Sequence, residues 1–563
     1  MGRITGNGTI SRRDALKLSA TAGLGLSMPL AVVASDSVKT AAHSGPGTLS
    51  TPRSAIAKTQ YGKVRGFLDG GVFTFKGVPY GATTAGENRW LPAKAPAAWT
   101  DEMLTLTYGG NCPQNLHSWT GAQTFIQDWD DGWISEDMLK LNIWTPSLTG
   151  KRPVMFYIHG GGFSFGSSYE LPSHEGANMA RFHDVVQVSV NHRLNILGFL
   201  DVAEIGGSAY EDSVNVGMTD LVVALKWVHE NIANFGGDPD RVMIYGQSGG
   251  GSKVTTLMGM PNANGLFSRA AAQSGGGGNI PTREQQREVS RQLMKDLGLH
   301  KNDIGALQKM EWARLNAAGN AAVMKVNPAG APMSGPMGSP PRAGWSPSID
   351  GKNITMRSFY DGAPDISKNV PMLVGSVSEE GNRMSQHPTE EQWHANLAKA
   401  YGEEKATALV STLKQAYPHK AIQTLSYMCS GAPGLNGLAM RNNVVKMAKQ
   451  KHDLNAAPAY AYYFTWQTPI LDGLPGAWHT AELQFCFDNA KRCEQGTGNT
   501  PEAQALAKKM ASCWATFAAT GKPSTATLKW SPSDPTNNQT MIFDNQCHMV
   551  NDPDGAARKI ILA

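Results

Sequence analysis

The sequence predicts an α/β fold in which a central, mostly parallel sheet is flanked by helices. Three runs rich in apolar residues, at 154–158, 185–190 and 242–245, predict strands, and the continuous apolar character of the first and the last is typical of strands that are buried on both faces. Between the last two runs, residues 215–235 carry apolar side chains at the spacing of a single helix face. Strands that alternate with a helix in this way favour a parallel sheet, because parallel neighbours need a crossover connection.

The composition is that of a large globular protein. Of 563 residues, 41% are hydrophobic and 17% are charged, which excludes a disordered or fibrous chain. This length predicts about two to four domains, although a large α/β enzyme can form one unit. The net charge is only +4 and no long run of Lys or Arg occurs, so no nucleic-acid partner is expected.

The first residues resemble a twin-arginine export signal. Arg12 and Arg13 precede a moderately apolar stretch at 18–34, and small residues near Ala34 or Ala42 fit a cleavage site. An uncleaved membrane anchor is the alternative, but the stretch is short and rich in Gly, Ser and Thr. No later run is long and apolar enough to span a bilayer. We therefore expect a periplasmic or secreted protein with no stable membrane insertion after cleavage.

Residues 246–250 read Gly-Gln-Ser-Gly-Gly and directly follow the third apolar run. This is the G-x-S-x-G pattern, in which a serine stands at a sharp strand-to-helix turn. The flanking glycines are needed because backbone strained in this way leaves no room for side chains. Alone, the pattern is weak, since a chain with 61 glycines can match it by chance in a glycine-rich loop.

A second glycine-rich motif reads His-Gly-Gly-Gly-Phe at 159–163. It directly follows the run at 154–158 and lies about 90 residues before Ser248. Such a motif supplies backbone amides to an oxyanion hole, and its glycines let the N–H groups approach the substrate oxygen. The alternative is a flexible turn, but the position after a buried strand argues against it.

Further segments extend this pattern over most of the chain. They read Phe-Lys-Gly-Val-Pro-Tyr at 75–80, Glu-Asp-Met-Leu-Lys-Leu-Asn-Ile-Trp at 136–144, Asn-His-Arg-Leu-Asn-Ile-Leu-Gly-Phe-Leu at 191–200 and Trp-His-Thr-Ala-Glu-Leu at 478–483. With the two glycine motifs, they resemble type-B carboxylesterases, the carboxylesterase/cholinesterase branch of the α/β-hydrolases, from about Tyr61 to the C-terminus. The resemblance implies the α/β-hydrolase fold, with large insertions that cap the active site.

The resemblance also implies a catalytic triad in the chain order Ser248, Glu380, His479. Ser248 is the serine of the G-x-S-x-G motif. The family's acid is the glutamate directly before a glycine, which is Glu380 before Gly381, and the neighbouring Glu379 is a competing candidate. Among the 14 histidines, His479 is the one whose surroundings match.

These residue types suit the hydrolysis of carboxylic esters. A serine hydroxyl is a poor nucleophile at neutral pH, so His479 would take its proton during attack and return it to the leaving alcohol. Glu380 would orient the imidazole and stabilise its charged form. The N–H groups of Gly161, Gly162 and Gly249 would hold the oxyanion. An acyl-enzyme forms and water completes the reaction, so we expect no cofactor and no metal.

The chain departs from the family pattern at two positions. Met138 stands where the family has a cysteine that pairs with one near Cys112, which implies that this disulfide is absent. The sequence has 6 cysteines, and it leaves their pairing open. Gln247 replaces the glutamate that precedes the serine in cholinesterases, which argues against choline esters as substrates.

The expected substrate is a small- or medium-sized carboxylic ester. The main rival hypothesis is a non-catalytic, cholinesterase-like binding protein, but such proteins have usually lost a triad member and all three are present here. A lipase or an amidase would use the same serine chemistry, and a specialised detoxifying or polymer-product esterase would share every motif. The sequence leaves the oligomeric state open.

The predicted domain plan has three parts. They are a signal peptide at 1–35, a flexible linker at 36–53 and a single α/β-hydrolase domain at 54–563. Cap insertions are expected at roughly 280–345 and 385–455. Within the first insertion, Pro, Gly and Met crowd residues 327–347, which predicts a loop or lid near the mouth of the pocket.

Overall fold

The structure is a computed structural model, and it describes residues 48–49, 54–115, 122–327, 341–381, 384, 388–429 and 436–562. The chain divides into two units, Met1–Pro46 and Gly47–Ala563, and every described residue belongs to the second. The predicted signal peptide and most of the predicted lid, residues 328–340, lie outside the described residues. Every helix and strand of the described residues belongs to the second unit.

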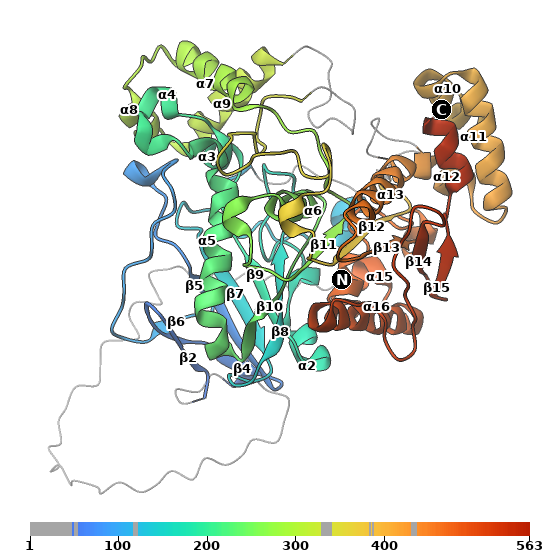
Figure 1. Cartoon of the computed structure of the whole chain (residues 1–563), viewed down its shortest axis with the longest axis horizontal. Coiled ribbons are helices and arrows are strands. Elements are labelled where there is room, and N and C mark those ends of the chain that lie inside the picture. Colours follow the sequence, from blue (N-terminus) through green and yellow to red (C-terminus); the bar gives the residue numbers. More distant parts are fainter. Residues whose placement is uncertain are drawn as a thin grey trace, which may run out of the picture. The chain divides into compact units, whose positions relative to one another are not determined.

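A large mixed sheet is the centre of the described chain (Figure 1). Its strands are ordered β1 (Thr48–Leu49), β4 (Phe67–Asp69), β5 (Val72–Pro79), β7 (Lys140–Thr145), β9 (Val186–Val190), β8 (Arg152–Ile158), β10 (Gly237–Gln247), β11 (Arg269–Gln273), β12 (Met372–Val377), β13 (Ala459–Phe464), β14 (Gln539–Phe543) and β15 (His548–Asn551). The strands from β9 to β14 are parallel, and the pairs at both edges are antiparallel. The predicted mostly parallel central sheet is confirmed.

Both faces of this sheet are buried, as the continuous apolar runs predict. Along β8, Val154 and Phe156 belong to one apolar core, while Met155 and Tyr157 belong to the other. Helices that cover the first face are α5 (Val216–Asn231), α6 (Gly249–Met258) and α13 (Gly437–Asp453); those on the second are α2 (Ala177–His183) and α16 (Pro501–Thr520). Burying an apolar side chain contributes roughly 1.5–3 kcal/mol to the stability of the fold, so these two cores hold the central strands firmly in place.

A second, small sheet is formed by short strands from the first part of the described chain. It contains β2 (Ile56–Thr59), β3 (Gly62–Arg65) and β6 (Met103–Leu104). A turn at Gly70 and Gly71 connects β4 to β5, and both glycines have positive φ, of 53° and 84°. L-residues with a side chain rarely adopt this conformation, so the glycines set the turn.

The first predicted insertion is helical where the structure describes it. It holds α7 (Arg283–Leu297), α8 (Ile304–Lys309) and α9 (Trp312–Val326). The Thr282 side chain accepts the N–H of Gln285, and the Gln285 side chain accepts the N–H of Thr282, which forms a capping box at the start of α7. This helix ends at Leu297, and Gly298 follows it with a positive φ of 65°.

The second predicted insertion is also helical. It holds α10 (Glu390–Tyr401), α11 (Glu403–Ala416), α12 (Ile422–Cys429) and α13. The first three of these helices share a core of their own with α17 (Gly555–Leu562), around Trp393 and Leu409 (Figure 1). That the two helical groups cap the active site stays a prediction.

The described chain contains all six cysteines as free thiols, five of them buried. Cys112 and Met138 are both buried in the larger core, and the family's disulfide between these positions has no counterpart. Instead, the Cys112 thiol accepts the N–H of Leu194 at 3.2 Å. In the same part of the chain, no helix combines the length and the apolar character that crossing a bilayer requires.

Candidate active site

Ser248 lies between β10 and α6, at the sharp turn that the G-x-S-x-G motif predicts. Its φ of 59° and ψ of −122° are outside the regions that L-residues favour, and this strain is typical of a functional turn. The Ser248 N–H donates to Gln273 O on β11 at 2.8 Å, which ties the turn to the sheet. A Cβ on Gly246 or Gly250 would lie 2.5 or 2.1 Å from Ile158 O, so only glycine fits beside β8.

His479 lies against Ser248 from a segment 231 residues further along the chain. Its Nε2 is 2.8 Å from Ser248 Oγ, and its Nδ1 makes a short hydrogen bond to Glu380 Oε2. Because the carboxylate accepts the Nδ1–H, Nε2 is left as the acceptor for the serine hydroxyl. The Glu380 side chain is 1% exposed and the His479 side chain 34%, so the imidazole alone of the two reaches solvent. The three predicted triad residues therefore lie in one hydrogen-bonded row.

Glu379, the competing acid, points elsewhere and holds structure together. Its buried carboxylate accepts the N–H of Ala477 at 2.7 Å and the hydroxyl of Ser378 at 2.6 Å, and it pairs with Lys420 at 3.2 Å. Ala477 is two residues before His479 in the chain. Glu379 thus fixes the backbone of the histidine segment, while Glu380 contacts the imidazole itself.

The glycine motif after β8 brings its backbone against the Ser248 turn. Gly161 and Gly162 have positive φ of 77° and 62°, and a Cβ on Gly249 would lie 2.5 Å from the nitrogen of Gly162. Within the described part of the chain, no hydrogen bond takes the N–H of Gly161 or Gly162. Gly249 is the first residue of α6, where N–H groups have no partner inside the helix. The three predicted oxyanion glycines thus lie beside Ser248, and their backbone N–H groups are available to donate to a substrate oxygen.

The sequence missed two contacts that position the histidine segment. Gln247 donates from Nε2 to the carbonyl of His479 at 2.5 Å, a role that its position before the serine gave no reason to expect. Gln127 donates to the hydroxyl of Thr480, the residue after the histidine. Both contacts join residues more than 200 positions apart, so no local pattern signals them.

A third carboxyl group lies near the acid of the row. Glu482 is fully buried beside Glu380, and burial raises its pKa to about 8, with the Glu380 charge adding to the effect. Its contact with the Ser274 hydroxyl is 3.5 Å long. Among the described residues, no group of three or more His, Cys, Asp or Glu side chains is arranged to hold a metal ion.

Comparison with known proteins gives a consistent picture. The model of the carboxylesterase family matches residues 53–558. The chain is 30% identical to the para-nitrobenzyl esterase of Bacillus subtilis (strain 168), over 90% of this chain and 98% of that protein. It is 31% identical to the phenmedipham hydrolase of Pseudarthrobacter oxydans, over 83% of this chain and 90% of that protein.

Solved structures agree with these sequences. An esterase from anaerobic Clostridium hathewayi, described as able to hydrolyse aliphatic aromatic polyesters, superposes with a TM-score of 0.77 at 32% identity, covering 90% of this chain and 97% of that one. A para-nitrobenzyl esterase superposes with a TM-score of 0.72 at 28% identity, over 90% and 99% of the two chains. The chain therefore belongs to the carboxylesterase family and is a carboxylesterase of the α/β-hydrolase fold.

Proposed function

We propose that this enzyme hydrolyses carboxylic esters through an acyl-enzyme formed on Ser248, with His479 as base and Glu380 as the acid of the triad. The observation that carries the proposal is the row Ser248 Oγ, His479 Nε2, His479 Nδ1, Glu380 Oε2, joined by two hydrogen bonds. A base within hydrogen-bond reach of the nucleophile, itself oriented by a third group, is the arrangement that activates a serine.

In the first half of the reaction, Ser248 Oγ attacks the ester carbonyl carbon while its proton passes to His479 Nε2. Glu380 stabilises the imidazolium without taking the proton. The carbonyl oxygen becomes an oxyanion, held by the N–H groups of Gly161, Gly162 and Gly249; losing one such donor costs about 10²–10³ in turnover. When the tetrahedral intermediate collapses, the proton on Nε2 goes to the leaving alcohol. The acyl group stays on Ser248.

In the second half, water repeats these steps. His479 takes a proton from the water as the hydroxide adds to the acyl carbon, and returns that proton to Ser248 Oγ as the carboxylic acid leaves. No oxidant or further group is needed for the atoms to balance. The same donors stabilise both oxyanions, so a single arrangement serves both halves.

The substrates proposed are neutral carboxylic esters of small or medium size. Gln247 carries no charge beside Ser248 and its amide is engaged with the carbonyl of His479, so a cationic alcohol gains no attraction from it. The names of the relatives support a broad range, because they describe a para-nitrobenzyl esterase, a phenmedipham hydrolase and an esterase active on polyesters.

The function is tested with p-nitrophenyl esters whose acyl chains run from two to sixteen carbons. Activity should be highest for short chains, and Ser248→Ala should abolish it at every length, because the attacking atom is gone. Its Tm should stay close to that of the original chain, since one hydroxyl is removed without a cavity in the core. Undiminished hydrolysis by Ser248→Ala would refute the mechanism.

The same preparation separates the rival functions. A lipase would hydrolyse the long-chain esters of olive oil faster than the short-chain ester tributyrin. An amidase would cleave an anilide at a rate near that of the corresponding ester. No turnover of any ester would favour the binding-protein hypothesis, which the assembled triad argues against.

We further propose that the enzyme is exported by a twin-arginine signal to the periplasm or the medium. The support is the Arg12-Arg13 pair followed by the moderately apolar stretch at 18–34.

A further inference from the structure

A lysine is buried directly behind the glycine motif. Lys253 lies on α6, and none of its surface is exposed. It follows Gly249 by four residues, and side chains four apart lie on the same face of a helix. A lysine is among the residues most rarely buried without a partner, so its contacts call for an explanation.

The ammonium group contacts the chain on both sides of the glycine triplet. Lys253 Nζ donates to His159 O at 3.0 Å and to Gly160 O at 3.4 Å. It also lies 5.7 Å from the centre of the Phe163 ring, within the range of a cation–π contact. One side chain thus holds the residues before and after Gly161 and Gly162.

The second of these bonds acts on a peptide group that faces the reaction. Gly160 O and the Gly161 N–H are the two ends of one planar amide, whose ends are coupled by resonance. Gly160 O accepts a hydrogen bond from Lys253 Nζ and also lies 3.1 Å from Nδ1 of the His159 ring. Donors at the carbonyl end polarise the amide and make its N–H a stronger donor, most of all where water is excluded.

Several side chains near Lys253 are also buried and carry titratable groups. Burial lowers the pKa of Lys253 to about 7, against the opposing charge of Glu170, and burial raises the pKa of Glu170 to about 8. Burial lowers the pKa of His159 and of His192, so both rings are neutral at the pH of the assays. Other titratable groups that act on this cluster are Asp131 on Glu170, Arg193 on His192, the neutral His174 and the thiol of Cys112.

We propose that Lys253 is a positioning residue of the oxyanion hole, which fixes and polarises the Gly160–Gly161 peptide through its charge. This inference rests on the proposed function of the glycine motif. Lys253 touches neither the substrate nor the triad, so it acts only through the backbone that it holds. Its charge should therefore matter in the transition state, when the oxyanion forms, more than in substrate binding.

Lys253→Met tests this by removing the charge while keeping the length of the side chain. We expect kcat to fall by about tenfold to a hundredfold, less than the loss of a whole oxyanion donor, with KM within about twofold. The inhibition constant of a trifluoromethyl ketone, which forms an oxyanion on the serine, should rise by the same factor. Lys253→Gln keeps a hydrogen-bond donor but not the charge, so its kcat should lie between those of the original chain and of Lys253→Met.

Lys451 on α13 provides a matched control. It too is a buried lysine, and its Nζ donates to two backbone carbonyls, Ser367 O at 2.8 Å and Lys368 O at 2.6 Å. None of these residues belongs to the proposed site. Lys451→Met should lower the Tm as Lys253→Met does, while kcat and the affinity for the ketone stay unchanged.

A pH comparison gives a readout that a purely structural role would not move. Raising the pH through about 7 removes the proton from Lys253, whereas the methionine variant has no proton to lose. The ratio of kcat between the original chain and Lys253→Met should therefore be larger at pH 6.5 than at pH 9.

Three outcomes would overturn the inference. One is a kcat for Lys253→Met within about twofold of the original, while Ser248→Ala is inactive; the proposed function would then stand without it. Another is an affinity of Lys253→Met for the ketone that equals that of the original chain or that of the Lys451→Met control. The last is a ratio of kcat that does not change with pH.

Should Lys253→Met fail to fold, the kcat of Lys253→Gln and its ratio to the original kcat at the two pH values decide. Activity retained by Ser248→Ala would instead refute the proposed function itself.

Discussion

Two adjacent glutamates divide between them the work of placing one histidine. Glu380 contacts the imidazole, and Glu379 holds the backbone at Ala477 and the ammonium of Lys420. Both residues lie just after β12 ends at Val377, where Glu379 forms an isolated bridge with Trp478, the residue before the histidine.

Replacing each glutamate by glutamine should separate these roles. Glu380→Gln should lower kcat by about 10³–10⁴, because an amide can hold the wrong imidazole tautomer and cannot stabilise the imidazolium. Glu379→Gln should lower kcat much less and the Tm much more, since it leaves Lys420 without its buried carboxylate. Steady-state kinetics and thermal unfolding of both variants check this. The reverse pattern would make Glu379 the catalytic acid.

How far the sequence predicts the site depends on the range of each contact. Ser248 and the glycine triplet stand in local motifs whose backbone geometry requires those residue types, so they can be found without a structure. The bonds from Lys253 to His159 O and from Gln247 to His479 O join distant segments. Their residue types fit many surroundings, so only the fold reveals what they hold.

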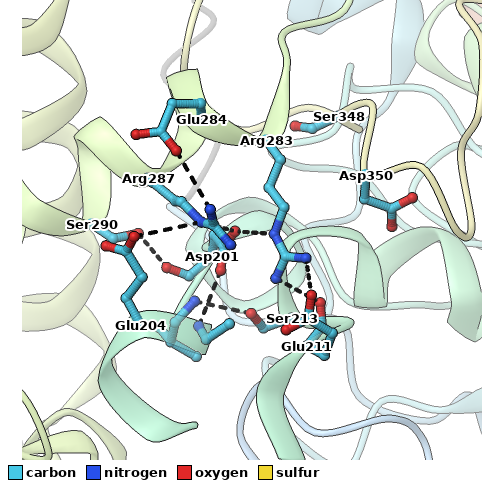
Figure 2. A network of polar contacts seen from close by, with 12 residues as sticks. Asp201, Glu204, Glu211, Ser213, Arg283, Glu284, Arg287, Ser290, Ser348 and Asp350 are labelled. Carbon is cyan, nitrogen blue, oxygen red and sulfur yellow. Dashed lines mark hydrogen bonds and ion pairs between the residues drawn. The ribbon is translucent and has the colours of Figure 1, made fainter. Parts of the chain in front are cut away.

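At the scale of elements, an ion-pair network holds α7 against the chain that follows β9. Figure 2 shows Arg283 between Asp201 and Glu211, with Arg287 beside it. The Asp201 carboxylate is 0% exposed, lies 2.7 Å from Arg283 Nε and is 3.4 Å from Arg287 Nε. A buried charge that loses its partner is costly, whereas exposed pairs contribute little.

Arg283→Met should therefore destabilise the protein more than Arg291→Met does. We expect a loss of about 3 kcal/mol, at the lower end for a broken buried pair because Arg287 stays near Asp201. Arg291 pairs with Glu204, Glu284 and Glu288 at the surface, and losing it should cost less than about 1 kcal/mol.

Urea unfolding of the two variants measures the difference. Added salt should reduce the effect of Arg291→Met and leave that of Arg283→Met nearly the same, because buried pairs are screened less. Equal losses for the two variants would contradict a special role for the Asp201 contact.

At the scale of the molecule, hydrophobic patterning predicts the central strands and their parallel order but not the edges of the sheet. The continuous apolar runs at 154–158 in β8 and 242–245 in β10 are those expected of strands buried on both faces. The edge strands β1 and β15 have two and four residues, too few for a periodic signal. Their pairing depends on which neighbour the folded chain offers them.

The export proposal also concerns the whole chain. Arg12→Lys combined with Arg13→Lys should keep the enzyme inside the cell, because the paired arginines are the feature that the export machinery recognises. Arg3→Lys, which leaves the pair intact, is the matched control. Esterase activity is measured in the medium, the periplasm and the cell interior. Export of the double variant at the original level would refute the twin-arginine assignment.

The six free thiols have a consequence for where folding can happen. Because no cysteine of the described chain is bonded to another, the native state needs no oxidant and no disulfide isomerase. Burial raises the pKa of the thiols of Cys429, Cys493 and Cys513 to about 12, so they stay protonated and unreactive toward oxidants. The fold therefore has no disulfide to form or to lose, and a reducing cytosol and an oxidising exterior can hold the same structure.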